Sequence, residues 1–137
     1  MTPARRSSPR PVGEGAVLIV DDDPPTLRLA SRVLARLGHE VLVADSGEEA
    51  LRIFASHPQP VDLLVTDVLM PGMSGRQLAE ALRRLRPDLP ILYMSGEALT
   101  TLYPDEPLPS GMFFLAKPFP PETLSAAAQE ALSWRMN

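Results

Sequence analysis

The chain has 137 residues, a length at which a single domain is the usual arrangement. Hydrophobic residues make up 45% and charged residues 22% of the sequence, as in folded globular domains. The absence of cysteine excludes disulfide scaffolds, thiolate metal sites and cysteine nucleophiles. A net charge of -4 argues against sequence-independent binding to nucleic acid.

The first 13 residues differ in composition from the rest of the chain. They contain three prolines, two serines and three arginines, with no acidic residue before position 14. We therefore expect a flexible basic leader over residues 1–13 and a folded domain over residues 14–137. No apolar run is long enough to span a membrane, and the start of the chain lacks the apolar stretch of a secretory signal. A cytoplasmic protein that binds neither membrane nor nucleic acid is expected.

The first expected element is an apolar, β-branched run at residues 16–20, which predicts a strand buried in a parallel sheet. Asp23 can cap the helix that follows it. A second strand is expected over residues 39–44. Ser46 and Glu49 have the spacing of a capping box, so another helix is expected to begin there.

The second half of the chain continues the alternation of strands and helices. A helix is expected after the third strand, and a last helix from about Pro121. The proline-rich segment 104–109 prevents a full helix before the fifth strand, so the fourth helix should be short or replaced by a loop. The remaining strands are expected over residues 61–66, 90–94 and 112–116.

This alternation predicts an α/β fold in which a five-stranded parallel sheet is covered by helices on both faces. The corresponding doubly wound, flavodoxin-like arrangement has the strand order 2-1-3-4-5. In that order the first and third strands are neighbours at the point where the strand order reverses. Ligands of open α/β sheets bind beyond the carboxyl ends of the strands at this point.

Polar side chains follow the expected strands at this edge of the sheet. Asp21 and Asp22 follow the first strand, Asp67 the third, Ser95 the fourth and Lys117 the fifth. The strand order brings the three carboxylates together, where they repel one another unless a cation lies between them. Mg²⁺, which prefers oxygen ligands, suits such a site. A carboxylate can then attack the phosphorus of a phosphoryl group, while the cation, a lysine and a hydroxyl group neutralise the phosphoryl oxygens.

Four segments in a fixed order carry a family resemblance: VLIVDDDP, DLLVTDVLMPGMSG, ILYMSG and FLAKPF. Together they resemble the response-regulator receiver domain (CheY-like) over about residues 16 to 134. The short, irregular stretch after MSG is closest in style to the receivers of hybrid sensor histidine kinases. The resemblance implies two-component signal transduction, in which a phosphoryl group changes the shape of the domain.

The resemblance also implies a role for individual residues. Asp67 would accept the phosphoryl group, Lys117 would pair with its oxygens, and Ser95 would hydrogen-bond one of them. Ser95 and Phe114 match the family's switch positions, although Phe114 can equally be an ordinary core residue. The peptide bond before Pro118 is expected to be cis.

The metal site implied by the resemblance holds Mg²⁺ through three carboxylates and one backbone carbonyl. The expected ligands are Asp21, Asp22, Asp67 and the carbonyl of Leu69. The phosphoryl donor would be a phosphohistidine on a sensor histidine kinase or a phosphotransfer protein. The chain would then be a phosphoacceptor that assists its own phosphorylation and dephosphorylation, not an enzyme, and its downstream effector is unknown.

Two other functions stay open. One is a receiver-fold interaction module without phosphorylation-dependent switching. The other is a Mg²⁺-dependent phosphatase, which would carry a second aspartate two residues after the nucleophile, where this chain has Leu69. His39 and His57 lie away from the predicted site and are expected in solvent.

Overall fold

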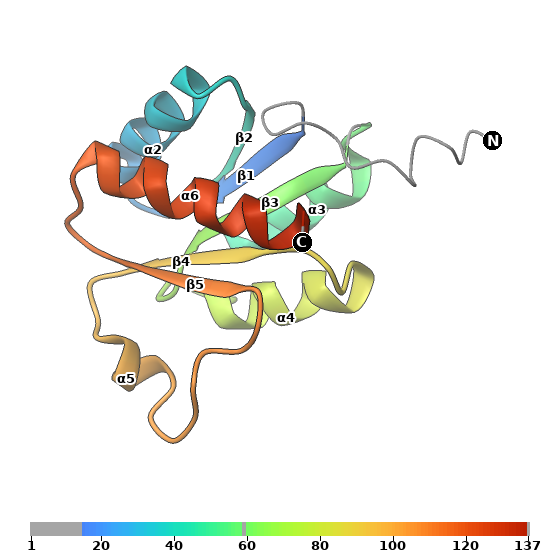
Figure 1. Cartoon of the computed structure of the whole chain (residues 1–137). Coiled ribbons are helices and arrows are strands. Elements are labelled where there is room, and N and C mark those ends of the chain that lie inside the picture. Colours follow the sequence, from blue (N-terminus) through green and yellow to red (C-terminus); the bar gives the residue numbers. More distant parts are fainter. Residues whose placement is uncertain (1–14, 59, 137) are drawn as a thin grey trace.

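The computed structural model describes residues 15–58 and 60–136, so the expected leader over residues 1–13 lies outside the described residues. Five parallel strands form one sheet in the order β2-β1-β3-β4-β5, which confirms the predicted fold class (Figure 1). The strands are β1 (Ala16–Val20), β2 (Glu40–Ala44), β3 (Val61–Asp67), β4 (Ile91–Ser95) and β5 (Met112–Ala116).

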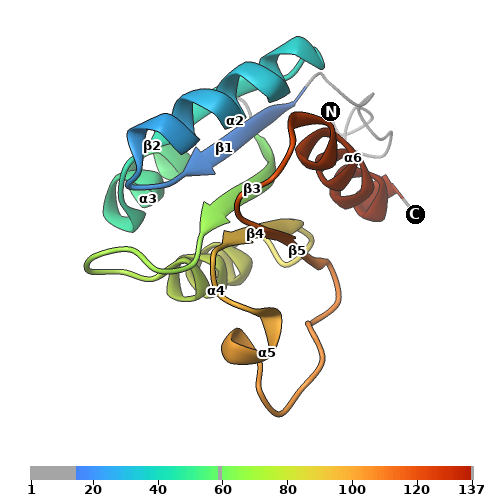
Figure 2. The same ribbon diagram turned by 90° about the vertical axis from the view of Figure 1, so that its left-hand side faces the viewer.

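Helices cover both faces of this sheet. Helices α2 and α6 lie on one face, and α3 and α4 lie on the other (Figures 1 and 2). The short helix α5 stands in the connection between β4 and β5. The helices are α2 (Pro24–Arg36), α3 (Gly47–Ser56), α4 (Gly75–Leu85), α5 (Leu99–Leu102) and α6 (Pro121–Met136).

The alternation of side chains along the central strands fills two separate cores. Every residue of β1 and β3 is buried. On β1, Leu18 and Val20 join the core beneath α3 and α4, whereas Val17 and Ile19 join the core beneath α2 and α6. Successive side chains point to opposite faces, so Asp21 continues the face of Ile19. The pattern that buries the core therefore also sets the direction of the first site residue.

The helix starts agree in part with the predicted caps. Asp23 caps α2 by accepting a hydrogen bond from the Thr26 N–H at 3.2 Å, as predicted. The Ser46 hydroxyl caps α3 by accepting from the Glu49 N–H at 3.1 Å. The Glu49 carboxylate, however, accepts from the Asp45 N–H at 2.9 Å instead of the N–H of Ser46. The predicted capping box is thus only half formed, because the side chain reaches one residue further back.

The prediction for the fourth helix is confirmed. Helix α5 has four residues, and its first residue follows Ala98, which makes no side-chain capping hydrogen bond. Because proline lacks an N–H and clashes with the preceding turn, segment 104–109 continues as an irregular connection to β5. No helix among the described residues is both long and apolar enough to cross a membrane.

The expectation that both histidines lie in solvent is wrong for His39. This residue precedes β2 and is 6% exposed, and its Nε2 has no hydrogen-bond partner among the described residues. Burial lowers the pKa of His39, and the negative charge of Asp62 only partly opposes this effect. His57 is half-buried, with its Nε2 3.1 Å from the Glu40 carboxylate. The local sequence did not indicate that His39 is buried. His39 stands where the polar residues end and the apolar residues of an edge strand begin, and nothing at this boundary shows what packs over it.

Burial of neutral His39 predicts a loss of stability in mild acid. The folded-state pKa lies below the unfolded value of 6.5, so the unfolded chain binds more protons as the pH falls below about 6.5. The free energy of unfolding should therefore fall with pH in this window. Urea unfolding of wild type and His39→Leu between pH 5 and 7.5 measures the effect. A smaller pH slope in the variant is expected, and equal slopes would contradict this assignment.

Candidate functional site

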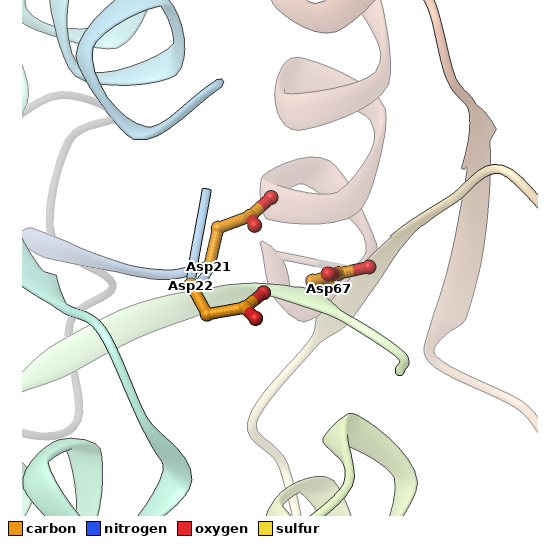
Figure 3. A group of neighbouring side chains, drawn as sticks. All are labelled: Asp21, Asp22 and Asp67. Atoms are coloured by element: carbon orange, nitrogen blue, oxygen red, sulfur yellow. The ribbon is translucent and has the colours of Figure 1, made fainter. Parts of the chain in front are cut away.

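Three carboxylates converge beyond the carboxyl ends of β1 and β3. Val20 of β1 pairs with Thr66 of β3, so Asp21 and Asp67 occupy the next position on neighbouring strands. Carboxylate oxygens of Asp21, Asp22 and Asp67 all lie within 4.8 Å of one another, and Figure 3 shows them gathered at this edge. Such a group of hard oxygen donors fits Mg²⁺.

Burial differs among these three acids. Asp21 is fully buried and Asp67 is 8% exposed, whereas Asp22 is open to solvent. The pocket therefore has a buried floor formed by two carboxylates and an accessible side formed by the third. A small ion or phosphoryl group can approach from the Asp22 side.

Lys117 supplies the positive charge opposite the carboxylates. It directly follows β5, which lies at the edge of the sheet, and its side chain reaches across to the β1 and β3 positions. The Lys117 Nζ lies 2.8 Å from Asp21 Oδ2 and 3.4 Å from Asp67 Oδ1. The backbone N–H of Lys117 donates to the Ser95 carbonyl at 2.8 Å, and the peptide bond to Pro118 is cis.

Electrostatics in the pocket favour a bound cation. Burial and the neighbouring charge of Asp21 raise the pKa of Asp67, while Lys117 acts in the opposite direction. The pKa of Lys117 is raised: burial opposes the charged form, but the hydrogen bond and charges of Asp21 and Asp67 outweigh it. One ammonium group thus neutralises the two buried carboxylates only in part. A divalent ion would relieve the remaining repulsion.

The two oxygens of the Asp67 carboxylate have different surroundings. Oδ1 accepts a hydrogen bond from the Val68 N–H at 2.9 Å and faces Lys117. Among the described residues, both of these contacts fall on Oδ1. Oδ2 is therefore the oxygen available to form a new bond.

Gly75 fixes the loop that follows Asp67, a role that the sequence reading missed. Its N–H donates to the Val68 carbonyl at 2.8 Å, and a Cβ there would lie 2.0 Å from the Asp67 carbonyl oxygen. Only glycine permits this approach. The signal in the sequence is a glycine at the first position of a helix, directly after Ser74. Leu69 lies in this loop and is 61% exposed.

Ser95 and Phe114 make their contacts with residues outside the carboxylate cluster. The Ser95 side chain is buried, and its Oγ accepts a hydrogen bond from the Glu97 N–H at 2.9 Å. Phe114 is half-buried, pairs in register with Tyr93, and packs against the core beneath α3 and α4. The structure thus brings Asp21, Asp22, Asp67 and Lys117 together, while Ser95 is engaged with its own loop.

A doubly wound five-stranded sheet with three clustered carboxylates and an opposed lysine at its carboxyl edge is an arrangement suited to binding a divalent cation. Residues 17–129 match the family described as the response regulator receiver domain. The chain therefore belongs to the response regulator receiver domain family, as the sequence motifs predicted. Receiver domains are phosphoacceptor signalling domains of two-component systems and bind Mg²⁺ at an acidic site.

Individual relatives support this assignment. The chain is 35% identical over 120 residues to the sensor kinase CckA of Brucella abortus, a match that covers 88% of this chain and 13% of the kinase. It is 34% identical over 103 residues to the response regulator receiver protein CpdR of the same organism, covering 75% of this chain and 84% of CpdR. The chain thus spans a small part of the kinase but most of CpdR.

Solved structures agree with the sequence matches. The receiver domain of the hybrid histidine kinase CckA superposes with a TM-score of 0.72 at 35% identity, covering 86% of this chain and 99% of that chain. The chemotaxis response regulator CheY4 of Vibrio cholerae gives a TM-score of 0.77 at 31% identity, covering 86% and 98%. The similarity to a hybrid-kinase receiver agrees with the expectation from the sequence.

Proposed function

We propose that Asp67 accepts a phosphoryl group from a phosphohistidine on a sensor histidine kinase or a phosphotransfer protein. The observation that supports this most strongly is the convergence of three carboxylates and one ammonium group at one edge of the sheet. One of the relatives, CckA, is a sensor kinase, which agrees with a kinase partner. Mg²⁺ would be held by Asp21, Asp22, Asp67 and the carbonyl of Leu69.

The proposed reaction transfers one phosphoryl group. The Asp67 Oδ2 forms an O–P bond while the N–P bond of the phosphohistidine breaks, and the released imidazole nitrogen takes up a proton. When bound, Mg²⁺ neutralises charge on the phosphoryl oxygens. Lys117 turns from the Asp67 carboxylate to a phosphoryl oxygen, which its position 3.4 Å from Oδ1 allows. The Val68 N–H keeps the carboxyl group oriented.

The functional output of this reaction is a conformational change of the domain, not the release of a product molecule. An aspartyl phosphate adds about two negative charges and new acceptor oxygens to the pocket. Ser95 then donates its hydroxyl hydrogen to one of these oxygens, and Phe114 packs behind it. Phosphorylation would change the relative populations of two surface arrangements, and an effector that binds only one of them would respond to this change.

Mg²⁺ with beryllofluoride, a phosphoryl mimic, tests this proposal. We expect both additions together to shift the amide resonances of Ser95 and Phe114. Asp22→Asn removes one carboxylate at the open side of the pocket, so about tenfold or more Mg²⁺ should be required for the same shift. The matched control is Asp45→Asn, an exposed aspartate at the end of β2, which should behave as wild type.

The interaction module without switching is the competing function. Unchanged amide resonances of Ser95 and Phe114 at saturating Mg²⁺ and beryllofluoride would favour it and contradict the proposal. A shift that is equal in wild type and Asp22→Asn across the Mg²⁺ titration would retain the phosphoryl site but contradict Asp22 as a ligand.

A further inference from the structure

The segment between β4 and β5 is fastened to the body of the domain although it lacks a full helix. Figures 1 and 2 show α5 and its flanking loops projecting below β4 and β5. Tyr103, which follows α5, is nevertheless only 5% exposed and belongs to the core beneath α3 and α4. Tyr103 thus anchors this segment, together with the half-buried Leu99 and Leu108, which pack against the same core.

Arg76 of α4 joins this anchor to the rest of the segment. The guanidinium carbon of Arg76 lies 4.2 Å from the centre of the Tyr103 ring, a cation–π contact. An Arg76 nitrogen lies 3.2 Å from the Glu106 carboxylate, beyond Tyr103 in the same segment. Arg76 also pairs with Glu80 on its own helix at 3.5 Å. We call Arg76, Tyr103 and Glu106 the Arg76 latch.

The Arg76 latch connects to β4 through a second tyrosine. The hydroxyl oxygens of Tyr93 and Tyr103 lie 3.2 Å apart, and the ring centres are 6.3 Å apart. Burial raises the pKa of Tyr93, so its hydroxyl stays protonated and can donate. Both hydroxyls lie 3.7 Å from the Met112 sulfur on β5. The latch therefore contacts the two strands that carry Ser95 and Phe114.

Ser95 lies within the same connected stretch. It stands two residues after Tyr93, so strand alternation places both side chains on the α4 face of the sheet. Its Oγ accepts the Glu97 N–H at 2.9 Å, and Glu97 lies two residues before α5. If Ser95 turns toward Asp67, the Glu97 N–H loses its acceptor unless the segment moves with it. Such a movement displaces α5 and, with it, the Tyr103 ring from its contact with Arg76.

We propose that Arg76 is a positioning residue that holds the segment from Glu97 to Glu106 in its phosphoryl-free arrangement and so opposes the turn of Ser95 toward Asp67. This inference rests on the proposed function of Asp67. A contact made only in the phosphoryl-free arrangement lowers the population of the competent one and weakens apparent phosphoryl-mimic binding by the same factor. Removing Arg76 should therefore strengthen that binding.

The test compares beryllofluoride dissociation constants at saturating Mg²⁺, measured by amide shifts on the whole chain. Arg76→Ala should bind about three- to tenfold tighter than wild type, as expected for loss of the cation–π contact with Tyr103 and the exposed ion pair with Glu106. Arg84→Ala removes the same charge from an exposed position on α4 and should leave the constant unchanged. Thermal unfolding of each variant separates an effect on binding from an effect on stability.

Two milder variants keep the test independent of the folding of Arg76→Ala. Glu106→Gln weakens the ion pair, and Tyr103→Phe removes the hydroxyl while keeping the ring. Each should tighten binding by less than Arg76→Ala.

Each other outcome has a distinct meaning. Equal binding by Arg76→Ala, Glu106→Gln and wild type would show that the latch is only structural and overturn the inference. Weaker binding by the variants would place the latch in the phosphorylated arrangement and also overturn it. A wild-type chain that binds no beryllofluoride would overturn the proposed function itself.

Discussion

Asp67→Asn is expected to abolish the mass gain of one phosphoryl group that we expect of the wild-type chain with Mg²⁺ and acetyl phosphate. An amide cannot form the acyl phosphate, so labelling should fall by about a hundredfold or more. The fold should survive, because asparagine keeps an oxygen that can accept the Val68 N–H. Removing this negative charge also relieves the burial of a charge and the repulsion by Asp21, which together raise the pKa of Asp67.

Intact-mass spectrometry over a time course measures this effect. Asp45→Asn, which changes an exposed acid that does not belong to the cluster of Asp21, Asp22 and Asp67, should be labelled as wild type. Equal labelling of Asp67→Asn and wild type would refute Asp67 as the acceptor. An unfolding midpoint of Asp67→Asn below that of wild type would contradict the interpretation that the buried charge of Asp67 destabilises the fold.

Lys117→Arg tests whether charge alone suffices opposite the carboxylates. Lys117 is the single lysine of the chain, and its compact ammonium lies within 2.8 Å of Asp21 and 3.4 Å of Asp67. The planar guanidinium keeps the charge but cannot occupy the same position. We expect the phosphorylation rate to fall about a hundredfold, the cost typical of losing one pre-positioned donor to developing negative charge.

The rate of Lys117→Arg is read from the same time course of intact mass. Arg84→Lys, a charge-conserving change at an exposed position on α4, is the matched control. A phosphorylation rate for Lys117→Arg within twofold of wild type would show that the exact placement of the positive charge is unimportant. This result would contradict the proposed role of Lys117.

The fold and the acidic pocket could be predicted because both follow from local patterns and strand order. The apolar runs identified the strands, and each polar residue that follows a strand must lie at the carboxyl edge of a parallel sheet. Asp21 and Asp67 become neighbours for this reason alone. Predicting the position of Lys117 required more information, because its side chain must extend from the end of β5 to the carboxylates beyond β1 and β3. Only the family motif indicated that it would.

The remaining features depend on contacts between residues far apart in the chain. Arg76 and Tyr103 belong to separate elements, and neither residue type is unusual where it stands. The burial of His39 likewise depends on what packs over the start of an edge strand. The engagement of Ser95 by the Glu97 N–H is a contact between residues only two apart, but it depends on the path of a loop that lacks regular structure. Periodicity cannot predict these contacts because they require the assembled fold.

A complete capping box was also missed, for a different reason. The Ser74 hydroxyl accepts the Gln77 N–H at 3.1 Å, and the Gln77 side chain accepts the Ser74 N–H at 2.9 Å. The spacing was present in the sequence, but it lies in the glycine- and methionine-rich loop after Asp67, which reads as irregular. This box starts α4 at Gly75, whose close approach to the Asp67 carbonyl sets the path of the loop after Asp67.

Locating the phosphoryl group on the wild-type chain tests the central claim most directly. After reaction with Mg²⁺ and acetyl phosphate, borohydride reduces an acyl phosphate to an alcohol, and tandem mass spectrometry of the peptides identifies the reduced residue. We predict reduction at Asp67 alone, dependent on Mg²⁺. Reduction at Asp21, Asp22 or any other acid, or modification that is unaffected by removing Mg²⁺, would contradict the account.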